Sequence, residues 1–133
     1  VEQEMEVLGA QQHGHPLDRL AACVNLAEVL RLKQAVEQVR VSEELKRYIV
    51  ELTAATRTRP GVQLGASPRA SLALMKASQA LALFDGMEFI TPEHVRELAV
   101  PVLAHRLVLD AQVTFAGQTG RTVVEDIVKN LPV

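Results

Sequence analysis

The stretch "GASPRASLALMKASQALALFDG", residues 65–86, decides the fold predicted for this chain. Ser67 and Pro68 are favoured at the N-cap and at the first position of a helix, and Gly86 is typical of a helix end. The alanine- and leucine-rich run between them predicts a helix from Pro68 to about Asp85, whose alanines would let neighbouring helices approach closely. The side chains expected to face the core are Leu74, Ala77, Leu81 and Phe84.

Arg69 is an unusual residue for the first turn of this helix. Free N–H groups and the positive end of the helix dipole lie there, so the position disfavours a cation and attracts an anion. Arg69 can either bind an anion together with the helix end or be an exposed arginine, alone or in a surface ion pair. Just before it, Gly65 permits close backbone approach or a positive φ angle. Arg57 and Arg59 could add positive potential but are interpreted as solvated loop charges.

Further helices are predicted before this stretch. The first covers residues 2–12, and a second follows Asn25, which forms a capping-box pattern with Glu28. Ser42 is expected to cap a third helix. The side chains expected to face inward in the third helix are Leu45, Ile49 and Leu52. Residues 56–66 are predicted to form a loop, since Pro60 and Gly61 are a turn signal.

After Gly86, the pattern predicts helices over 92–99 and 101–107, because Pro101 lacks an N–H group and should kink or split one longer helix. Thr122 and Glu125 form a capping-box pattern for a last helix. Its buried face is expected to contain Val124, Ile127, Val128 and Leu131. The predicted fold is mainly α, a helical bundle formed as a single domain by residues 1–133, with a small β-hairpin or an ordered loop near residues 107–118.

Composition excludes several function classes. The chain has 133 residues, is 48% hydrophobic and has a net charge of −2, which suits one folded domain without overall basic character. We therefore expect no nucleic-acid partner. No apolar run approaches the roughly 18 residues of a membrane span, so no membrane partner is expected either. The single cysteine fits a reducing compartment, and the expected location is the cytoplasm.

The remaining candidate residues favour structural roles. Cys23 is interpreted as a small buried hydrophobic residue. His13 and His15 could ligate a metal, but no carboxylate or cysteine at ligand spacing supports this, and they are interpreted as turn residues. His105 lies near a helix end, where a cation is favourable. The sequence contains no phosphate-binding loop with a lysine, no G-x-S-x-G and no H-E-x-x-H motif, so we expect no metal site and no catalytic turnover by this chain alone.

Residues 65–107 carry a resemblance to a known family. The motif G-x-S-P-R-A, a helix, T-P-x-x-V and then L-x-H-R-L occur here in that order, and this region resembles the C-terminal lid of MoxR-type AAA+ ATPases. The likeness includes "HPLDRL" at 15–20, "VSEELKRYIVELTAATR" at 41–57 and "TVVEDIVKNLPV" at 122–133. The chain also begins within a helical pattern, so it is expected to be part of a longer ATPase.

The resemblance implies a role for Arg69. The arginine of the S-P-R-A motif is the sensor-2 residue in that family, so Arg69 would be the catalytic and nucleotide-binding residue that reaches the γ-phosphate of ATP. The cofactors implied for the longer protein are ATP and Mg²⁺. The implied partners are its own AAA+ core, neighbouring subunits of a homo-oligomeric ring and a von Willebrand A-domain protein. The implied function is chaperone-like remodelling or maturation of partner complexes.

Two other function classes remain as alternatives. A stand-alone helical protein-interaction module without nucleotide function would suit the same helical pattern. A helical nucleic-acid binder would use residues 107–118 as a winged hairpin, but this segment contains no lysine and has Asp110 within it, which is unfavourable beside phosphates.

Overall fold

The computed structural model describes residues 1–12 and 14–133, which form two contact units, Val1–Leu32 and Lys33–Val133. The first unit contains α1 (Glu2–Gln11) and the short 3₁₀ helix η1 (Pro16–Arg19). Helix α2 (Leu26–Gln38) begins in the first unit and ends in the second. The predicted helix over residues 2–12 is therefore confirmed.

The predicted capping box at the start of α2 is also confirmed. The Asn25 N–H donates to Glu28 Oε2 at 2.7 Å, and the Glu28 N–H donates to Asn25 Oδ1 at 2.9 Å. No described residue of α1 or α2 is buried, so capping rather than core packing defines where α2 begins.

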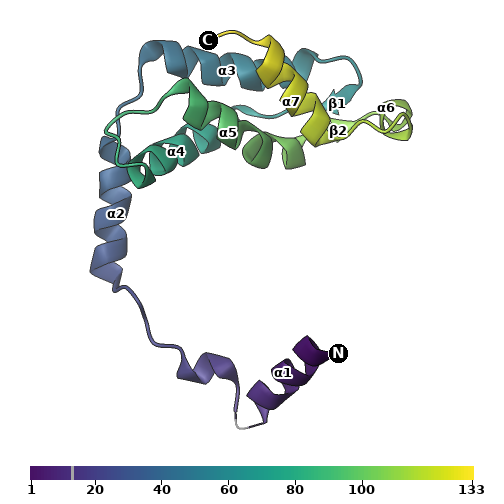
Figure 1. Ribbon diagram of the computed structural model, residues 1–133. Coiled ribbons are helices and arrows are strands. Elements are labelled where there is room, and N and C mark those ends of the chain that lie inside the picture. The colour runs from purple at the N-terminus through teal and green to yellow at the C-terminus, as the bar shows by residue number, and fades with distance from the viewer. Residues whose placement is uncertain (13) are drawn as a thin grey trace. The chain divides into compact units, whose positions relative to one another are not determined.

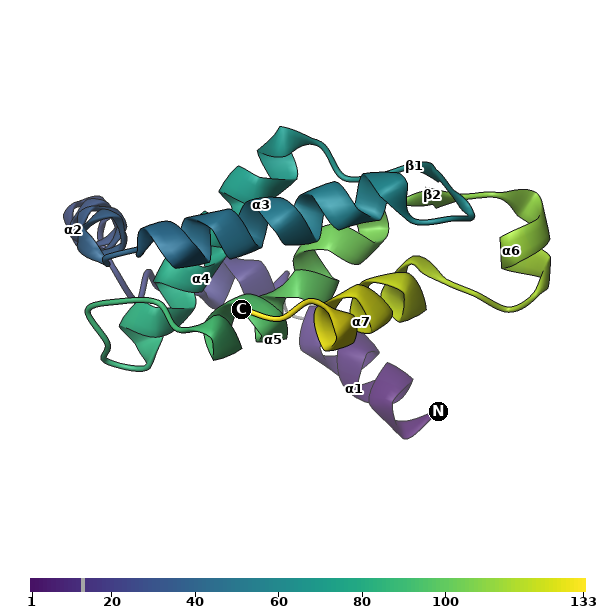
Figure 2. The same cartoon turned by 90° about the horizontal axis from the view of Figure 1, so that it is seen from above.

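The second unit is built on four helices that surround one hydrophobic core: α3 (Glu43–Thr58), α4 (Pro68–Phe84), α5 (Pro92–Leu103) and α7 (Gly120–Asn130). Helix α5 packs against α4 and α7, and α3 contacts both α4 and α7 (Figures 1 and 2). The Ser42 hydroxyl accepts the Leu45 N–H at 3.2 Å, as predicted for the start of α3. Core side chains with no more than 2% exposure include Tyr48, Ile49, Leu52, Leu74, Val95, Ala99, Leu103 and Val124.

The mainly α fold with a small β element is confirmed. Strand β2 (Val108–Leu109) lies in the segment where β structure or an ordered loop was expected, and the short helix α6 (Ala111–Phe115) follows it. The antiparallel partner of β2 is β1 (Val62–Leu64), which lies within the predicted loop before α4. The Asp110 N–H donates to the Gly61 carbonyl at 2.9 Å and extends this pairing. The two strands therefore join segments that lie far apart in the sequence.

Helix α5 corrects the prediction at Pro101. The helix is continuous through this proline, and a 3₁₀ turn, η2 (Ala104–Arg106), follows it. A proline removes one helical hydrogen bond, whose acceptor here would be the carbonyl of Glu97. Both Pro101 and Glu97 are exposed, so water can solvate that carbonyl, while the buried face of α5 keeps its packing on the core.

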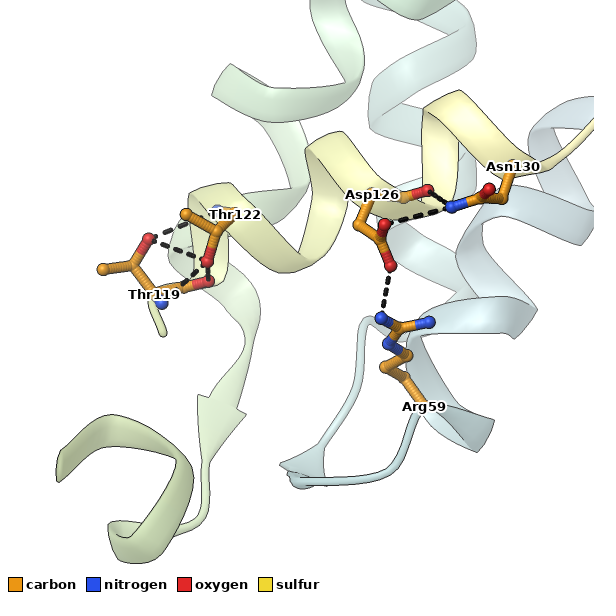
Figure 3. A network of polar contacts seen from close by, with 5 residues as sticks. All are labelled: Arg59, Thr119, Thr122, Asp126 and Asn130. Carbon is orange, nitrogen blue, oxygen red and sulfur yellow. Dashed lines mark hydrogen bonds and ion pairs between the residues drawn. The ribbon is translucent and has the colours of Figure 1, made fainter. Parts of the chain in front are cut away.

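Helix α7 begins earlier than predicted. Its capping box is formed by Thr119 and Thr122: the Thr119 N–H donates to Thr122 Oγ1 at 2.9 Å, and the Thr122 N–H donates to Thr119 Oγ1 at 3.2 Å (Figure 3). The box predicted between Thr122 and Glu125 was wrong, because Glu125 instead pairs with Arg121 within the helix. Val124 and Ile127 are buried as predicted.

The buried face of α4 also differs from the prediction. Leu74 is buried, but Phe84 is 90% exposed, and Ala77 and Leu81 are only half-buried. The face that contacts the core is formed by Ala70, Leu74, Ser78, Gln79 and Ala82. Small side chains on this face let α4 approach its neighbours closely, so packing geometry, rather than the largest apolar side chains, determines its orientation.

No helix among the described residues has both the length and the apolar character needed to cross a membrane.

Candidate functional site

The N-terminus of α4 places Arg69 in the first helical turn. Ser67 is the N-cap residue, as predicted, with extended backbone angles, and Pro68 is the first helical residue. The Ser67 side chain makes no capping hydrogen bond, however, so the predicted capping role of its hydroxyl was wrong. Arg69 is exposed and forms no hydrogen bond or ion pair with any described residue. The Ala70 N–H donates to the Ser67 carbonyl at 2.8 Å and Pro68 has no N–H, so it is the guanidinium, at the positive end of the helix dipole, that is open to an anion.

The backbone just before Arg69 is held tightly against the end of α3. The Ala66 N–H donates to Thr56 Oγ1 at 2.9 Å, and Arg57 Nη1 donates to the Ala66 carbonyl at 2.8 Å. Thr56 is fully buried and Ala66 is 1% exposed. We call this pair of contacts, made by Thr56 and Arg57, the Ala66 anchor.

Gly65 makes the Ala66 anchor sterically possible. A Cβ atom at this position would lie 2.7 Å from both the Cα and the N atoms of Arg57. Because these are backbone atoms of a helix, they cannot move aside as a side chain would. Of the two roles that the sequence allowed for Gly65, the structure therefore shows close backbone approach.

The structure corrects the interpretation of Arg57 and Arg59 as solvated loop charges. Arg57 belongs to α3 and is bonded to the Ala66 carbonyl. Arg59, which follows α3, forms an ion pair with Asp126 on α7 (Figure 3). Asn130 Nδ2 donates to Asp126 Oδ1 at 3.0 Å and so helps to orient this carboxylate. Arg57 thus links the end of α3 to the segment before α4, and Arg59 links it to α7.

Helix α7 offers an internal comparison for Arg69. Arg121 is also exposed and is also the second residue of its helix. The N-terminus of α7 carries the Thr119–Thr122 capping box, and Arg121 Nη1 lies 3.3 Å from Glu125 Oε1. Within the described part of the chain, Arg121 thus has an acidic partner at a capped helix end, whereas Arg69 has none at an uncapped end. This contrast singles out the start of α4 as the candidate anion site.

The other predicted site residues have structural surroundings. His15 Nδ1 accepts the Leu17 N–H at 3.2 Å and so caps η1, as expected of a turn histidine. His13 lies outside the described residues. His105 Nδ1 lies 3.1 Å from the Pro101 carbonyl, one helical turn earlier. No group of three or more His, Cys, Asp or Glu side chains that could hold a metal ion occurs in the described residues.

Cys23 is exposed, so its interpretation as a buried hydrophobic residue was wrong. It lies between η1 and α2, in a segment where every described residue is exposed.

His94 is a buried histidine that sequence reasoning missed. The Thr91 N–H donates to His94 Nδ1 at 2.9 Å, so the ring proton is on Nε2, which lies 3.1 Å from Asp85 Oδ2. His94 therefore acts as the third residue of a capping box at the start of α5 and joins it to the end of α4. Its position three residues after Thr91 is the signal that could have indicated this role.

Comparisons with known proteins identify the family. A family model for the AAA lid domain matches residues 54–127. The chain belongs to the AAA lid domain family. The matched residues contain the Ala66 anchor, Arg69 and the first eight residues of α7.

Relatives of the lid support the MoxR type. This chain is 37% identical over 131 residues to the uncharacterized protein YeaC of Bacillus subtilis, and the match covers 98% of this chain and 41% of YeaC. It is 36% identical over 95 residues to Chaperone MoxR1 of Mycobacterium tuberculosis, covering 65% of this chain and 25% of MoxR1. The likeness to a MoxR-type AAA+ lid is therefore confirmed, and the chain spans less than half the length of either relative.

A solved structure shares the fold of the lid. The crystal structure of a candidate ATPase from Cytophaga hutchinsonii superposes with a TM-score of 0.81 at 27% sequence identity. The match covers 98% of this chain and 42% of that one. The helical arrangement described above is thus found within a considerably longer protein.

Sequence reasoning located Arg69 in the lid but missed the residues that hold its surroundings. Thr56 and Arg57 lie in the last turn of the amphipathic helix α3, nine or ten residues before their partner Ala66, a separation at which no local periodicity applies. Only Gly65 gave a signal, since a glycine at this position allowed either a close backbone contact or a positive φ angle.

Proposed function

We propose that residues 1–133 form the lid of an AAA+ ATPase and that Arg69 is its sensor-2 residue, which contacts the γ-phosphate of ATP. The proposal rests on one observation above all: Arg69 is exposed and without a partner among the described residues, at an uncapped helix N-terminus whose approach segment is held in place. Elsewhere in the described chain, the comparable Arg121 has an acidic partner.

The chemistry of the site suits a phosphate group. A guanidinium donates two parallel hydrogen bonds to phosphate oxygens, and its positive charge persists at any physiological pH. The helix N-terminus adds a favourable dipole. The chain provides no cluster of metal ligands among its described residues, so the proposal assigns Mg²⁺ and the remaining phosphate contacts to the ATPase core.

Arg69 would make the position of the lid depend on the nucleotide. A contact with the γ-phosphate stabilises the arrangement in which lid and core both touch ATP. Hydrolysis and release of that phosphate remove the contact, so the arrangement of lid and core changes between the ATP and ADP states. Through this change the lid would couple ATP hydrolysis to its own movement relative to the core.

The proposal extends to the assembly and its partners. We propose that the lid associates with its own AAA+ core and with neighbouring subunits of a homo-oligomeric ring in the cytoplasm. Because one relative is named Chaperone MoxR1, we assign the ring to chaperone-like remodelling or maturation of partner complexes. A von Willebrand A-domain protein is the further partner implied by the MoxR-type resemblance of the sequence.

The test is ATP hydrolysis by the longer ATPase that carries this lid, with Arg69→Ala compared with the matched variant Arg121→Ala. Loss of one aligned charge-stabilising donor typically lowers turnover about 100-fold or more. We expect a loss of this order for Arg69→Ala and a change of less than about twofold for Arg121→Ala, whose ion pair is exposed.

Equal activity of the two variants would contradict the proposal. Arg69 would then be a surface arginine, and a helical protein-interaction module without nucleotide function would be the better description. A reduction common to both variants, accompanied by lower thermal stability, would indicate a folding defect rather than loss of a phosphate contact.

A further inference from the structure

We infer that Thr56 and Arg57 are positioning residues for Arg69: through the Ala66 anchor they set the direction in which α4 begins. This inference rests on the proposed function of Arg69. We assign these two residues no contact with nucleotide or metal; they act only through the backbone of the segment that leads to Arg69.

The Ala66 anchor satisfies both backbone groups of one residue. Thr56 Oγ1 accepts the Ala66 N–H at 2.9 Å while donating to the Thr53 carbonyl at 2.6 Å, so the hydroxyl is held by two bonds. Arg57 Nη1 donates to the Ala66 carbonyl at 2.8 Å. A residue bonded at both its N–H and its C=O has little freedom of rotation about its backbone bonds.

The anchor lies close enough to Arg69 to control it. Only Ser67 and Pro68 separate Ala66 from Arg69, and the proline ring restricts its own φ angle. The Ser67 side chain forms no capping bond that could define the helix start locally. The direction of the first turn of α4 therefore depends on Ala66 and on packing of the buried residue Ala70.

The first measurement follows amide hydrogen exchange in this chain by NMR. Thr56→Val keeps the shape of the side chain but removes the acceptor of the Ala66 N–H. Thr53→Val is the matched control, because Thr53 is equally buried on the same helix but donates only to the Ile49 carbonyl at 2.9 Å. We expect exchange of the Ala66 amide to increase at least about tenfold in Thr56→Val beyond any change in the control.

Two further variants keep the inference testable if Thr56→Val folds poorly. Thr56→Ser retains the hydroxyl and should restore slow exchange to within about threefold of wild type. Arg57→Met removes the donor to the Ala66 carbonyl at an exposed side chain, so it should fold and still loosen Ala66. Unchanged exchange at Ala66 in both Thr56→Val and Arg57→Met would overturn the inference.

The second measurement is ATP hydrolysis by the longer ATPase. A small misplacement of a catalytic group can lower the rate by about 100-fold, so we expect at least a tenfold loss for Thr56→Val relative to Thr53→Val, with recovery in Thr56→Ser. If Arg69→Ala abolishes hydrolysis while Thr56→Val matches Thr53→Val, the positioning role is wrong and the function of Arg69 stands. If Arg69→Ala has no effect, the proposed function fails, whatever the exchange data show.

Discussion

Two adjacent residues on the buried face of α4 should respond to mutation in opposite directions. Ser78 is fully buried, and its Oγ has no hydrogen-bond partner among the described residues. Gln79 is 9% exposed, and its Nε2 donates to the Val39 carbonyl at 2.7 Å. We predict that Ser78→Ala stabilises the lid and that Gln79→Met destabilises it.

The magnitudes follow from hydrogen-bond satisfaction. A buried polar group without a partner costs about 1–3 kcal/mol, and alanine is also the better helix former by a few tenths of a kcal/mol. Loss of the contacts of one oxygen atom subtracts a few tenths, so Ser78→Ala should raise the free energy of unfolding by about 1–2 kcal/mol. Gln79→Met keeps the length of the side chain but leaves the Val39 carbonyl without its donor, at a cost of about 1–3 kcal/mol.

The assay is thermal and urea unfolding followed by circular dichroism of the helices. For a chain of this size, 1 kcal/mol corresponds to about 3–5 °C in Tm, so the two variants should differ by about 6 °C or more. A Ser78→Ala variant less stable than wild type by over about 1 kcal/mol would contradict this prediction, because the hydroxyl would then have a favourable partner. A neutral Gln79→Met would show that its bond to Val39 contributes little.

Three further predictions concern helix ends. Gly120→Ala should lower stability by about 1–3 kcal/mol in urea unfolding, because a Cβ atom there would lie 2.3 Å from the Ala104 carbonyl oxygen; a neutral result would show that this contact relaxes freely. His94→Ala should lower the free energy of unfolding by about 1–3 kcal/mol. His94→Gln should lower it less, because glutamine can also accept the Thr91 N–H. Equal losses of stability in thermal unfolding of the two variants would contradict the capping role. The backbone N–H of Glu93 and the Thr91 hydroxyl hold the pKa of the Glu93 carboxyl below its usual value of 4.5. The ionised carboxylate therefore stabilises the folded state above pH 4.5, and this contribution disappears as the pH falls through the lowered pKa. The Tm difference between wild type and Glu93→Gln should therefore shrink below pH 4.5, and a difference that grows instead would reverse this sign.

Local signals predicted the helices of this lid well. The Asn25–Glu28 capping box, the Ser42 cap and the Ser67–Pro68 start of α4 all depend on residues within three positions of one another, where the sequence contains the necessary information. Arg69 was located for the same reason, since its place in the first turn follows from the residues just before it.

Contacts between distant segments were not predictable from one sequence. The buried face of α4 depends on which of its small residues the neighbouring helices can approach. Apolar periodicity does not contain this information, and it wrongly placed Phe84, which is exposed, on that face. The continuity of α5 through Pro101 depends on packing that outweighs one lost hydrogen bond. The pairing of β1 with β2 and the contacts of Thr56 and Arg57 likewise require the tertiary structure.

A contact between Arg69 and the γ-phosphate is best tested by the affinity of the longer ATPase for ATPγS and for ADP, measured in the wild type and in Arg69→Ala. A hydrogen bond to a charged group contributes about 1.5–3 kcal/mol, which corresponds to at least about a tenfold change in Kd. We expect Arg69→Ala to weaken binding of ATPγS by that factor and to change ADP affinity less than about twofold. Equal effects on both nucleotides, or none on either, would contradict a contact between Arg69 and the γ-phosphate.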